Sequence, residues 1–161
     1  MDNILKKYRD LNAIKTSLNV FINDVPNSSN KNWNGTNKEN PTYRKWRDMK
    51  YRVLNHKNYY TVKIDSSWYI YSNFAKDISN LKNFNKPNYE LDKDLYFLIN
   101  KNIPKVYSKD TCYFLPKPIN LVLRSFPTKS LQTKLKLKNL INIFKNDLDT
   151  NVVDMLEELT K

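Results

Sequence analysis

Apolar side chains recur along the chain with periods that change from helical to strand-like and back. From Asp2 to Ile22 they return every three or four residues, which predicts an amphipathic helix. A second helix is predicted to start at Asn40 as the cap, with Pro41 in its first turn. Between these helices, residues 23–40 have almost no apolar content, and they predict a long loop.

The second predicted helix places two large apolar residues, Trp46 and Met49, toward a core. A short strand is predicted where Tyr60, Val62 and Ile64 alternate with polar residues. A further helical face follows, and it is made of Trp68, Tyr71, Phe74, Ala75 and Ile78.

The stretch from Tyr89 to Leu123 changes period twice. Alternation at Tyr89–Asp92 predicts one strand, and an Asn-rich connection leads to a second strand that spans Val106 to Phe114. Pro116 and Pro118 end that strand and permit a helix from Ile119 onward. The predicted order is strand, strand, helix, with Asp92 and Asp94 near the end of the first strand.

Two helices are predicted at the C-terminal end. Leu131, Leu135, Leu137, Leu140, Ile141 and Phe144 support the first, and Asp149 or Thr150 caps the second. The 161 residues include one glycine, Gly35, so turns must rely on Asn and Asp.

A net charge of +12 favours an anionic partner such as nucleic acid or an acidic membrane, although a solvated lysine-rich surface would have the same composition. No apolar run is long enough to span a membrane and no signal-peptide pattern is present, so we expect a soluble, cytoplasmic protein. One Cys and one His exclude a Cys and His zinc cluster, and Cys112 is expected to be a buried thiol.

Basic side chains gather on two of the predicted helices. Phosphate contact and simple solvation both explain them, because basic residues on an exposed helix position a protein on DNA without reading sequence. The candidate nucleic-acid-binding residues are Arg44, Lys45, Arg47, Lys50, Arg52, Lys134, Lys136 and Lys138. A lone His56 in a loop is more often structural than catalytic.

Several short motifs occur in a specific order. They read Leu91 Asp92 Lys93 Asp94, then Tyr107 Ser108 Lys109 Asp110 Thr111 Cys112, then Phe114 Leu115 Pro116, then Ile119 Asn120. Their order and spacing resemble those of the HNH-type homing endonucleases of bacteriophages. The resemblance implies an α+β fold, a ββα-metal core with flanking helices at both ends. It also implies a shortened member without the ethylene-response-type DNA-binding domain. The expected regions are an N-terminal helix and start of a loop (residues 1–30), an HNH-like core (31–125), and a basic connection with the C-terminal helices (126–161). A phage protein of this kind is expected in the host-cell cytoplasm or in the virion.

The resemblance also implies a chemistry. An HNH site binds one divalent metal, here Mg²⁺ or Mn²⁺, and matching positions make Asp92, Thr111 and Asn120 the metal ligands. The same comparison makes Asp92, Lys93 and Asp94 the catalytic residues, but Lys93 stands where the family has its general-base histidine. A lysine flanked by two carboxylates keeps its proton at neutral pH and cannot accept another.

Two functions therefore stay open at this point. In the first, the protein binds double-stranded DNA and is an endonuclease or nickase with a degenerate active site. In the second, it is a catalytically inactive, HNH-derived binding or structural protein that acts on a virion component or a host protein. A plasmid-nicking assay distinguishes them.

Overall fold

The computed structural model describes residues 21–29, 35, 38–126 and 130–161, and the predicted helix over Asp2–Ile22 lies almost entirely outside this range. The described chain mixes helices with short strands, as the predicted α+β class requires. It divides into two compact units. The first contains the described residues up to Ser79 together with Val106–Ser108, and the second contains Asn80–Lys105 and Lys109–Lys161.

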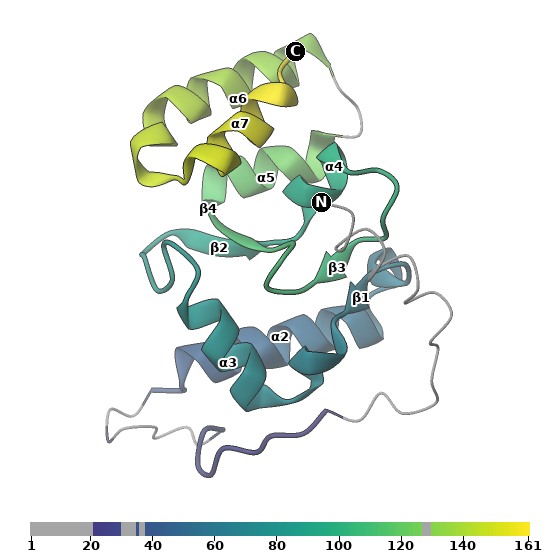
Figure 1. Cartoon of the computed structure of the whole chain (residues 1–161), viewed down its shortest axis with the longest axis vertical. Helices are drawn as coiled ribbons and strands as arrows, with labels where there is room; N and C mark the ends of the chain where they lie inside the picture. Colours follow the sequence, from purple (N-terminus) through teal and green to yellow (C-terminus); the bar gives the residue numbers. More distant parts are fainter. Residues whose placement is uncertain (1–20, 30–34, 36–37, 127–129) are drawn as a thin grey trace. The chain divides into compact units, whose positions relative to one another are not determined.

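The first unit is mainly helical (Figure 1). Its elements are α2 (Pro41–Asn55), η1 (Lys57–Tyr59), β1 (Lys63–Ile64), η2 (Ser66–Tyr69), α3 (Tyr71–Ser79) and β3 (Val106–Tyr107). Strands β1 and β3 are parallel neighbours, with Lys63 beside Val106 and Ile64 beside Tyr107.

Helix α2 begins as predicted and packs its aromatic face inward. The Asn40 side chain accepts hydrogen bonds from the backbone N–H groups of Thr42 and Tyr43, which caps the helix. Trp46 and Met49 are each 1% exposed. The Trp46 indole donates to the carbonyl of Trp68 at 2.8 Å, so burying this ring leaves no donor without a partner.

The predicted strand from Tyr60 to Ile64 is wrong in its first half. Residues 57–59 form a 3-10 turn, and the Val62 N–H donates to the Tyr59 carbonyl, so only Lys63 and Ile64 are extended. Tyr60 is consequently 81% exposed rather than part of a strand face. The face predicted from Trp68 onward is confirmed, since Trp68, Tyr71, Phe74 and Ile78 are all buried.

The second unit contains a two-stranded antiparallel sheet and five α- or 3-10 helices among its described residues. Its elements are β2 (Tyr89–Asp92), α4 (Asp94–Ile99), β4 (Tyr113–Pro116), α5 (Lys117–Ser125), α6 (Leu131–Phe144), η4 (Lys145–Asp147) and α7 (Thr150–Glu158). Strand β2 pairs with β4 from Tyr89 opposite Pro116 to Asp92 opposite Tyr113.

The core of the second unit is mostly aliphatic and joins α4, β4, α5, α6 and α7. Its buried members are Leu95, Leu115, Ile119, Val122, Leu123, Phe126, Leu137, Ile141, Leu148, Val152 and Leu156. Two leucines predicted to belong to the apolar face of α6 do not, because Leu131 is 73% and Leu135 53% exposed. Both predicted C-terminal helices are present, and the second begins directly after Asp149, one of the two predicted caps.

The central prediction is right at its ends and wrong in its middle. A strand, an antiparallel strand and a helix with Pro118 in its first turn occur in the predicted order as β2, β4 and α5. The expected loop after Lys93 is instead helix α4, and Val106–Tyr107 pairs with β1 rather than continuing into β4. Asp92, which precedes the N-cap residue Lys93, supports this helix because its carboxylate accepts from the Leu95 N–H in the first turn.

Asparagine replaces glycine at the tight turns, as the composition predicted. Among the described residues other than Gly35, four have positive φ and all four are Asn. They are Asn27 (60°), Asn83 (66°), Asn85 (59°) and Asn88 (63°). Three of them lie between α3 and β2, where they allow the chain to turn within a few residues.

Candidate functional site: a buried acidic turn and two basic helices

Asp92 ends strand β2 as a buried carboxylate that is 2% exposed. Its Oδ2 accepts the Leu95 N–H at 2.9 Å, while its Oδ1 is buried and has no hydrogen-bond partner within the described part of the chain. Burial and the nearby charge of Asp94 raise the pKa of Asp92 to about 6, against the Leu95 hydrogen bond and the Lys93 charge. The carboxylate therefore changes charge close to physiological pH.

The two residues after Asp92 form a buried ion pair. The Lys93 Nζ lies 3.0 Å from both carboxylate oxygens of Asp94, and the Lys105 Nζ lies 3.0 Å from Oδ1 of the same group. Burial works against the Asp94 charge, but the two ammonium groups outweigh it and lower the pKa of Asp94. The structure thus brings the three predicted catalytic residues together, with Lys93 and Asp94 bonded to each other. Lys105 was missed, because it is eleven residues away in sequence.

The predicted ligand Asn120 is buried on helix α5 and is held by a second carboxylate. Its amide nitrogen donates to the Glu90 Oε2 at 2.7 Å, and Arg124 lies 3.5 Å from the same oxygen. Alternate residues of a strand share a face, so Glu90 and Asp92 point to the same side of β2, roughly 7 Å apart along it. Glu90 was not predicted, although its spacing of two from Asp92 could have shown it.

Thr111, the third predicted ligand, is buried just before β4 and is 1% exposed. The neighbouring thiol of Cys112 is free and 0% exposed, which confirms the expected buried cysteine. Tyr113 lies opposite Asp92 in the strand pair, and burial together with the surrounding acidic groups raises the pKa of its phenol. The cluster around Asp92 is therefore largely closed to water.

The residues as arranged do not fit a divalent metal ion. Mg²⁺ requires near-octahedral oxygen coordination, whereas Asp92 offers one oxygen without a partner and Asp94 is neutralised by two lysines. In the described ranges, no three His, Cys, Asp or Glu side chains form a group that could hold a metal. Binding of Mg²⁺ or Mn²⁺ by Asp92, Thr111 and Asn120 stays a prediction.

Most basic side chains of α2 already contact other groups of the first unit. Arg47 pairs with Glu39 and Asp48, and the Arg52 Nε donates to the Asp48 carbonyl at 3.1 Å. The Lys50 ammonium lies over the Trp46 ring at 3.8 Å from its centroid. The remaining two predicted contacts of this helix, Arg44 and Lys45, are exposed and half-buried respectively. Burial and the neighbouring Arg44 lower the pKa of Lys45.

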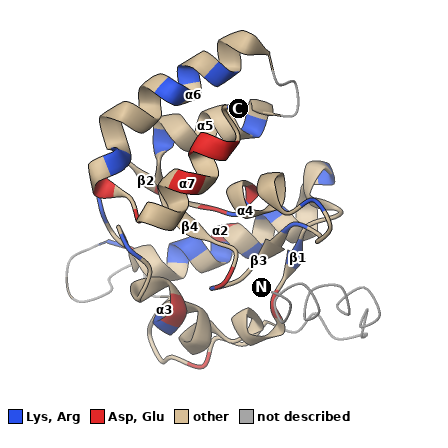
Figure 2. Ribbon diagram, turned by 45° about the horizontal axis from the view of Figure 1, so that its top comes forward, with Lys and Arg blue, Asp and Glu red and all other residues tan. Residues whose placement is uncertain are grey.

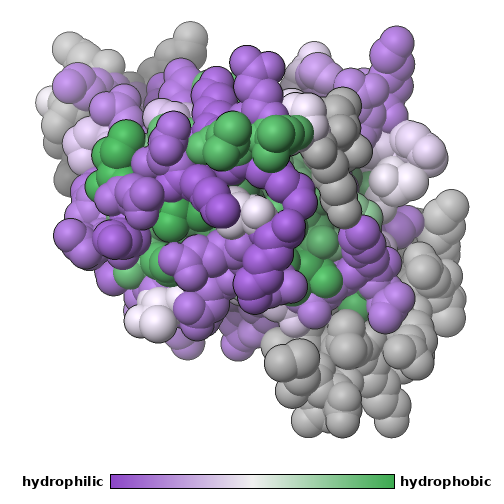
Figure 3. All heavy atoms as spheres, turned by 90° about the horizontal axis from the view of Figure 1, so that it is seen from above, coloured by the Kyte–Doolittle hydropathy of each residue, from purple (hydrophilic) through white to green (hydrophobic). Residues whose placement is uncertain are grey.

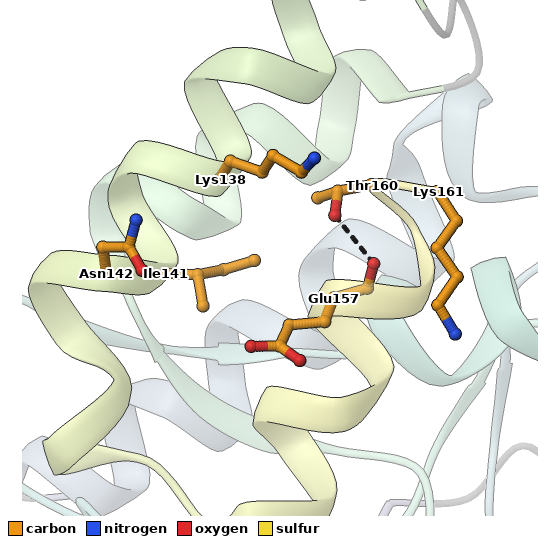
Figure 4. Close-up of a pocket in the computed structure, with 6 residues that line it drawn as sticks. All are labelled: Lys138, Ile141, Asn142, Glu157, Thr160 and Lys161. Carbon is orange, nitrogen blue, oxygen red and sulfur yellow. Dashed lines mark hydrogen bonds between the residues drawn. The ribbon is translucent and has the colours of Figure 1, made fainter.

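Helix α6 has lysines and no acidic residue, and it packs beside the acidic helix α7 (Figure 2). Lys138 and Glu157 line one hollow of about 340 Å³ between these helices, where Figure 4 shows the Thr160 hydroxyl bonded to the Glu157 carbonyl. Lys134 and Lys136 carry no ion pair to any residue that the structure describes.

Lys136 lines a larger hollow of about 580 Å³. Lys117, the first residue of α5, and Lys86 also line it, around an apolar floor that includes Tyr89 and Phe144. Lys86 pairs with Asp147 at 2.9 Å, which leaves the charges of Lys117 and Lys136 uncompensated. Lys117 was missed because it follows Pro116 in what was predicted as the end of a strand.

Exposed apolar side chains alternate with the polar ones over α6 (Figure 3). Leu131 is 73%, Leu135 53% and Ile143 69% exposed, and Asn139 and Asn142 lie on the same exposed face. The basic surface of the second unit is therefore mixed with apolar groups rather than uniformly charged.

Comparisons with known proteins add no relative. No family model matches the chain, no curated protein matches it, and no solved structure matches it. Within the described residues, no helix has both the length and the apolar character needed to cross a membrane. The HNH resemblance, the DNA partner and the cytoplasmic or virion location stay predictions.

Proposed function

We propose that the protein binds double-stranded DNA through phosphate contacts made by the second unit, on a strand-strand-helix scaffold related to HNH endonucleases. One observation supports this proposal above the others. Lys117 and Lys136 come from two helices, line the same hollow, and have no acidic partner in the described chain. Lys134 adds a third charge on α6.

Such a surface recognises the regular charge of the DNA backbone. Lysine ammonium groups bind phosphates as point charges and release condensed counterions, which gives affinity that falls steeply with salt and depends little on sequence. The net charge of +12 adds long-range attraction for the same partner.

We propose further that the orthodox HNH hydrolysis is not performed. Lys93 occupies the general-base position, and its ammonium group is bonded to both oxygens of Asp94 in a buried ion pair. A protonated, paired lysine has no lone pair with which to accept a proton from water. Duplex binding without cleavage is the resulting activity.

The test is duplex binding by Lys117→Ala/Lys136→Ala, measured by fluorescence anisotropy on a random-sequence 20-base-pair duplex at several salt concentrations. We expect about tenfold weaker binding at 50 mM salt, and a slope of log affinity against log salt that is shallower by about 2, because two phosphate contacts are lost. Lys101→Ala/Lys109→Ala removes the same charge from other exposed positions and is the matched control.

Equal effects of the two double variants would mean that only net charge matters, and would contradict the proposed site. A wild-type protein that fails to bind duplex DNA at 50 mM salt would contradict the function itself. An acidic virion or host protein would then be the partner that the basic surface fits.

A metal-dependent endonuclease or nickase is the second candidate, and it rests on the resemblance to HNH endonucleases. Because the residues as arranged do not fit Mg²⁺, this candidate requires Asp94 to exchange its two lysine partners for an ion beside the unpartnered Oδ1 of Asp92. A nicking assay tests this candidate: wild-type protein and Asp92→Asn are each incubated with supercoiled plasmid and Mg²⁺ or Mn²⁺. Nicking by the wild type that the variant loses would establish the nuclease, whereas intact plasmid in both reactions would exclude it.

A further inference from the structure

Four aromatic side chains of the first unit form what we call the ring cluster: Tyr51 on α2, His56, Tyr59 in η1, and Tyr60, which directly follows η1. Tyr51 is 60% and Tyr60 81% exposed, and His56 is exposed as well. The His56 ring lies between two tyrosines, with centroids 6.0 Å from Tyr51 and 6.2 Å from Tyr59. Both pairs meet edge to face, at 77° and 65°.

This ring cluster is held on an ordered backbone. The Tyr59 N–H donates to the His56 carbonyl at 2.8 Å, and the Val62 N–H donates to the Tyr59 carbonyl at 2.9 Å. Val62 and Ile64 then anchor the segment, since each is 5% exposed. The rings are thus presented before any ligand arrives, which lowers the entropy cost of binding.

The charge within this segment is of one sign. Residues 49–64, between Asp48 and Asp65, contain four basic side chains and no Asp or Glu, and Lys57, which follows His56, is exposed. Interfaces for proteins are usually enriched in aromatic residues too, but an acid-free, basic and aromatic segment is typical of surfaces that hold unpaired bases.

We propose that the ring cluster, Tyr51, His56, Tyr59 and Tyr60, binds single-stranded nucleic acid by stacking its bases, with Lys57 contacting the backbone. Every base has a π-face, so stacking tolerates any sequence, and Lys57 and Lys63 supply the positive charge that tracks the phosphates. Duplex DNA keeps its bases paired and stacked, so this surface discriminates in favour of single strands. The site uses none of the lysines of the second unit and is independent of the duplex-binding proposal.

The experiment measures binding of labelled oligothymidylate of 15 nucleotides to the full chain by fluorescence anisotropy. Tyr51→Ala/Tyr60→Ala should weaken binding by tenfold or more, because each stacked base is worth about fivefold to a hundredfold. Tyr51→Phe/Tyr60→Phe keeps both rings and should bind like the wild type. Leu54→Ala, an exposed apolar residue on the same helix, is the matched control and should also bind normally.

Each other outcome overturns the proposal. Equal affinity for the Ala and wild-type proteins would remove these rings from the site, and equal loss in the Phe variant would assign the effect to the hydroxyl groups rather than stacking. A wild-type protein that binds the duplex but not the oligothymidylate would make the ring cluster a protein-docking surface. Unchanged thermal melting of the Ala variant verifies folding, as expected for two exposed side chains.

Discussion

The two units use their polar groups in opposite ways. In the first unit, Asn40 caps α2 and also bonds to the Tyr71 hydroxyl, and both indole N–H groups of Trp46 and Trp68 have acceptors. In the second unit, Asp92 keeps one buried oxygen without a described partner, and Lys136 keeps a charge that no described acid pairs with.

This difference shows why charge counting alone misassigns a binding surface. Helices α2 and α6 both look basic in sequence, but α2 pairs or covers most of its charges while α6 does not. What the first unit offers to solvent is aromatic rings, and what the second unit offers is ammonium groups. We therefore expect that removing rings from the first unit lowers affinity without changing its salt dependence, whereas removing lysines from the second unit reduces the salt dependence.

The largest expected effect tests the interior of the first unit. Trp46→Ala should lower the free energy of unfolding by about 3–5 kcal/mol, because it removes a ring that is 1% exposed and a hydrogen bond to Trp68. Urea unfolding followed by circular dichroism measures this loss. Tyr51→Ala on the same helix is the control, and a loss as large there would contradict the assignment of α2 as a structural helix.

Charge reversal compares the two basic helices directly. Lys134→Glu/Lys136→Glu on α6 should weaken duplex binding about 100-fold, or about 2.7 kcal/mol, because it removes two phosphate contacts and adds repulsion. Arg44→Glu/Arg47→Glu on α2 should weaken it about tenfold or less. Anisotropy on one duplex at fixed salt measures both, and a larger effect from α2 would reverse the comparison.

The pH dependence of stability tests whether Asp92, the buried carboxylate with an unpartnered oxygen, ionises in the folded second unit. Its folded pKa of about 6 exceeds its ordinary value of 3.8, so its contribution to stability is complete below about pH 4 and is lost as pH rises through 6. The loss is about 3 kcal/mol above that pH. The contribution of Asp94 has the opposite pH dependence, because its folded pKa is lowered. Asp94 stabilises the fold at pH values above its ordinary pKa, and this stabilisation is lost as the pH falls through the folded pKa.

Asp92→Asn removes the titration and keeps an acceptor for the Leu95 N–H, at the expense of one buried amide donor worth about 1 kcal/mol. The free energy of unfolding of the variant should therefore exceed that of the wild type by about 2 kcal/mol at pH 8. At pH 4.5 the two free energies of unfolding should be nearly equal. Urea unfolding at the two pH values measures the difference. A gap that does not grow with pH would show that Asp92 is not a buried, ionising group.

The smallest expected effect comes from freeing a basic residue of α2, which makes this helix more like α6. Glu39→Gln/Asp48→Asn releases Arg47 from both acidic partners and should strengthen duplex binding about twofold to threefold, since exposed ion pairs are worth well under 1 kcal/mol. Asp154→Asn/Glu157→Gln makes the same change in net charge on α7 at two exposed positions and is the control. An equal gain in both variants would show that net charge alone is responsible.

The sequence predicted local structure well where one periodicity dominates. The cap at Asn40, the buried Trp46 and the C-terminal helices follow from spacing and propensity within a few residues. It failed between the two paired strands, where Asp92 accepts from the Leu95 N–H in the first turn of α4 and a helix stands in place of the predicted loop. Strand β3 was misassigned for a related reason, because its partner β1 lies more than forty residues earlier.

For the candidate site, sequence could locate Asp92, Lys93 and Asp94 but could not show how they interact. The ion pairs to Lys105 and the bond between Asn120 and Glu90 join residues far apart in the chain, and no spacing rule predicts them. The predicted ligands Thr111 and Asn120 are both buried, which spacing also could not show.

The three left-handed asparagines between α3 and β2 have a consequence for how this protein tolerates mutation. Asn83, Asn85 and Asn88 stand at positions where a branched side chain would strain the backbone. A saturation scan of this segment should accept glycine at all three sites and reject valine and isoleucine. A chain nearly devoid of glycine would thus acquire its most neutral substitutions as glycines.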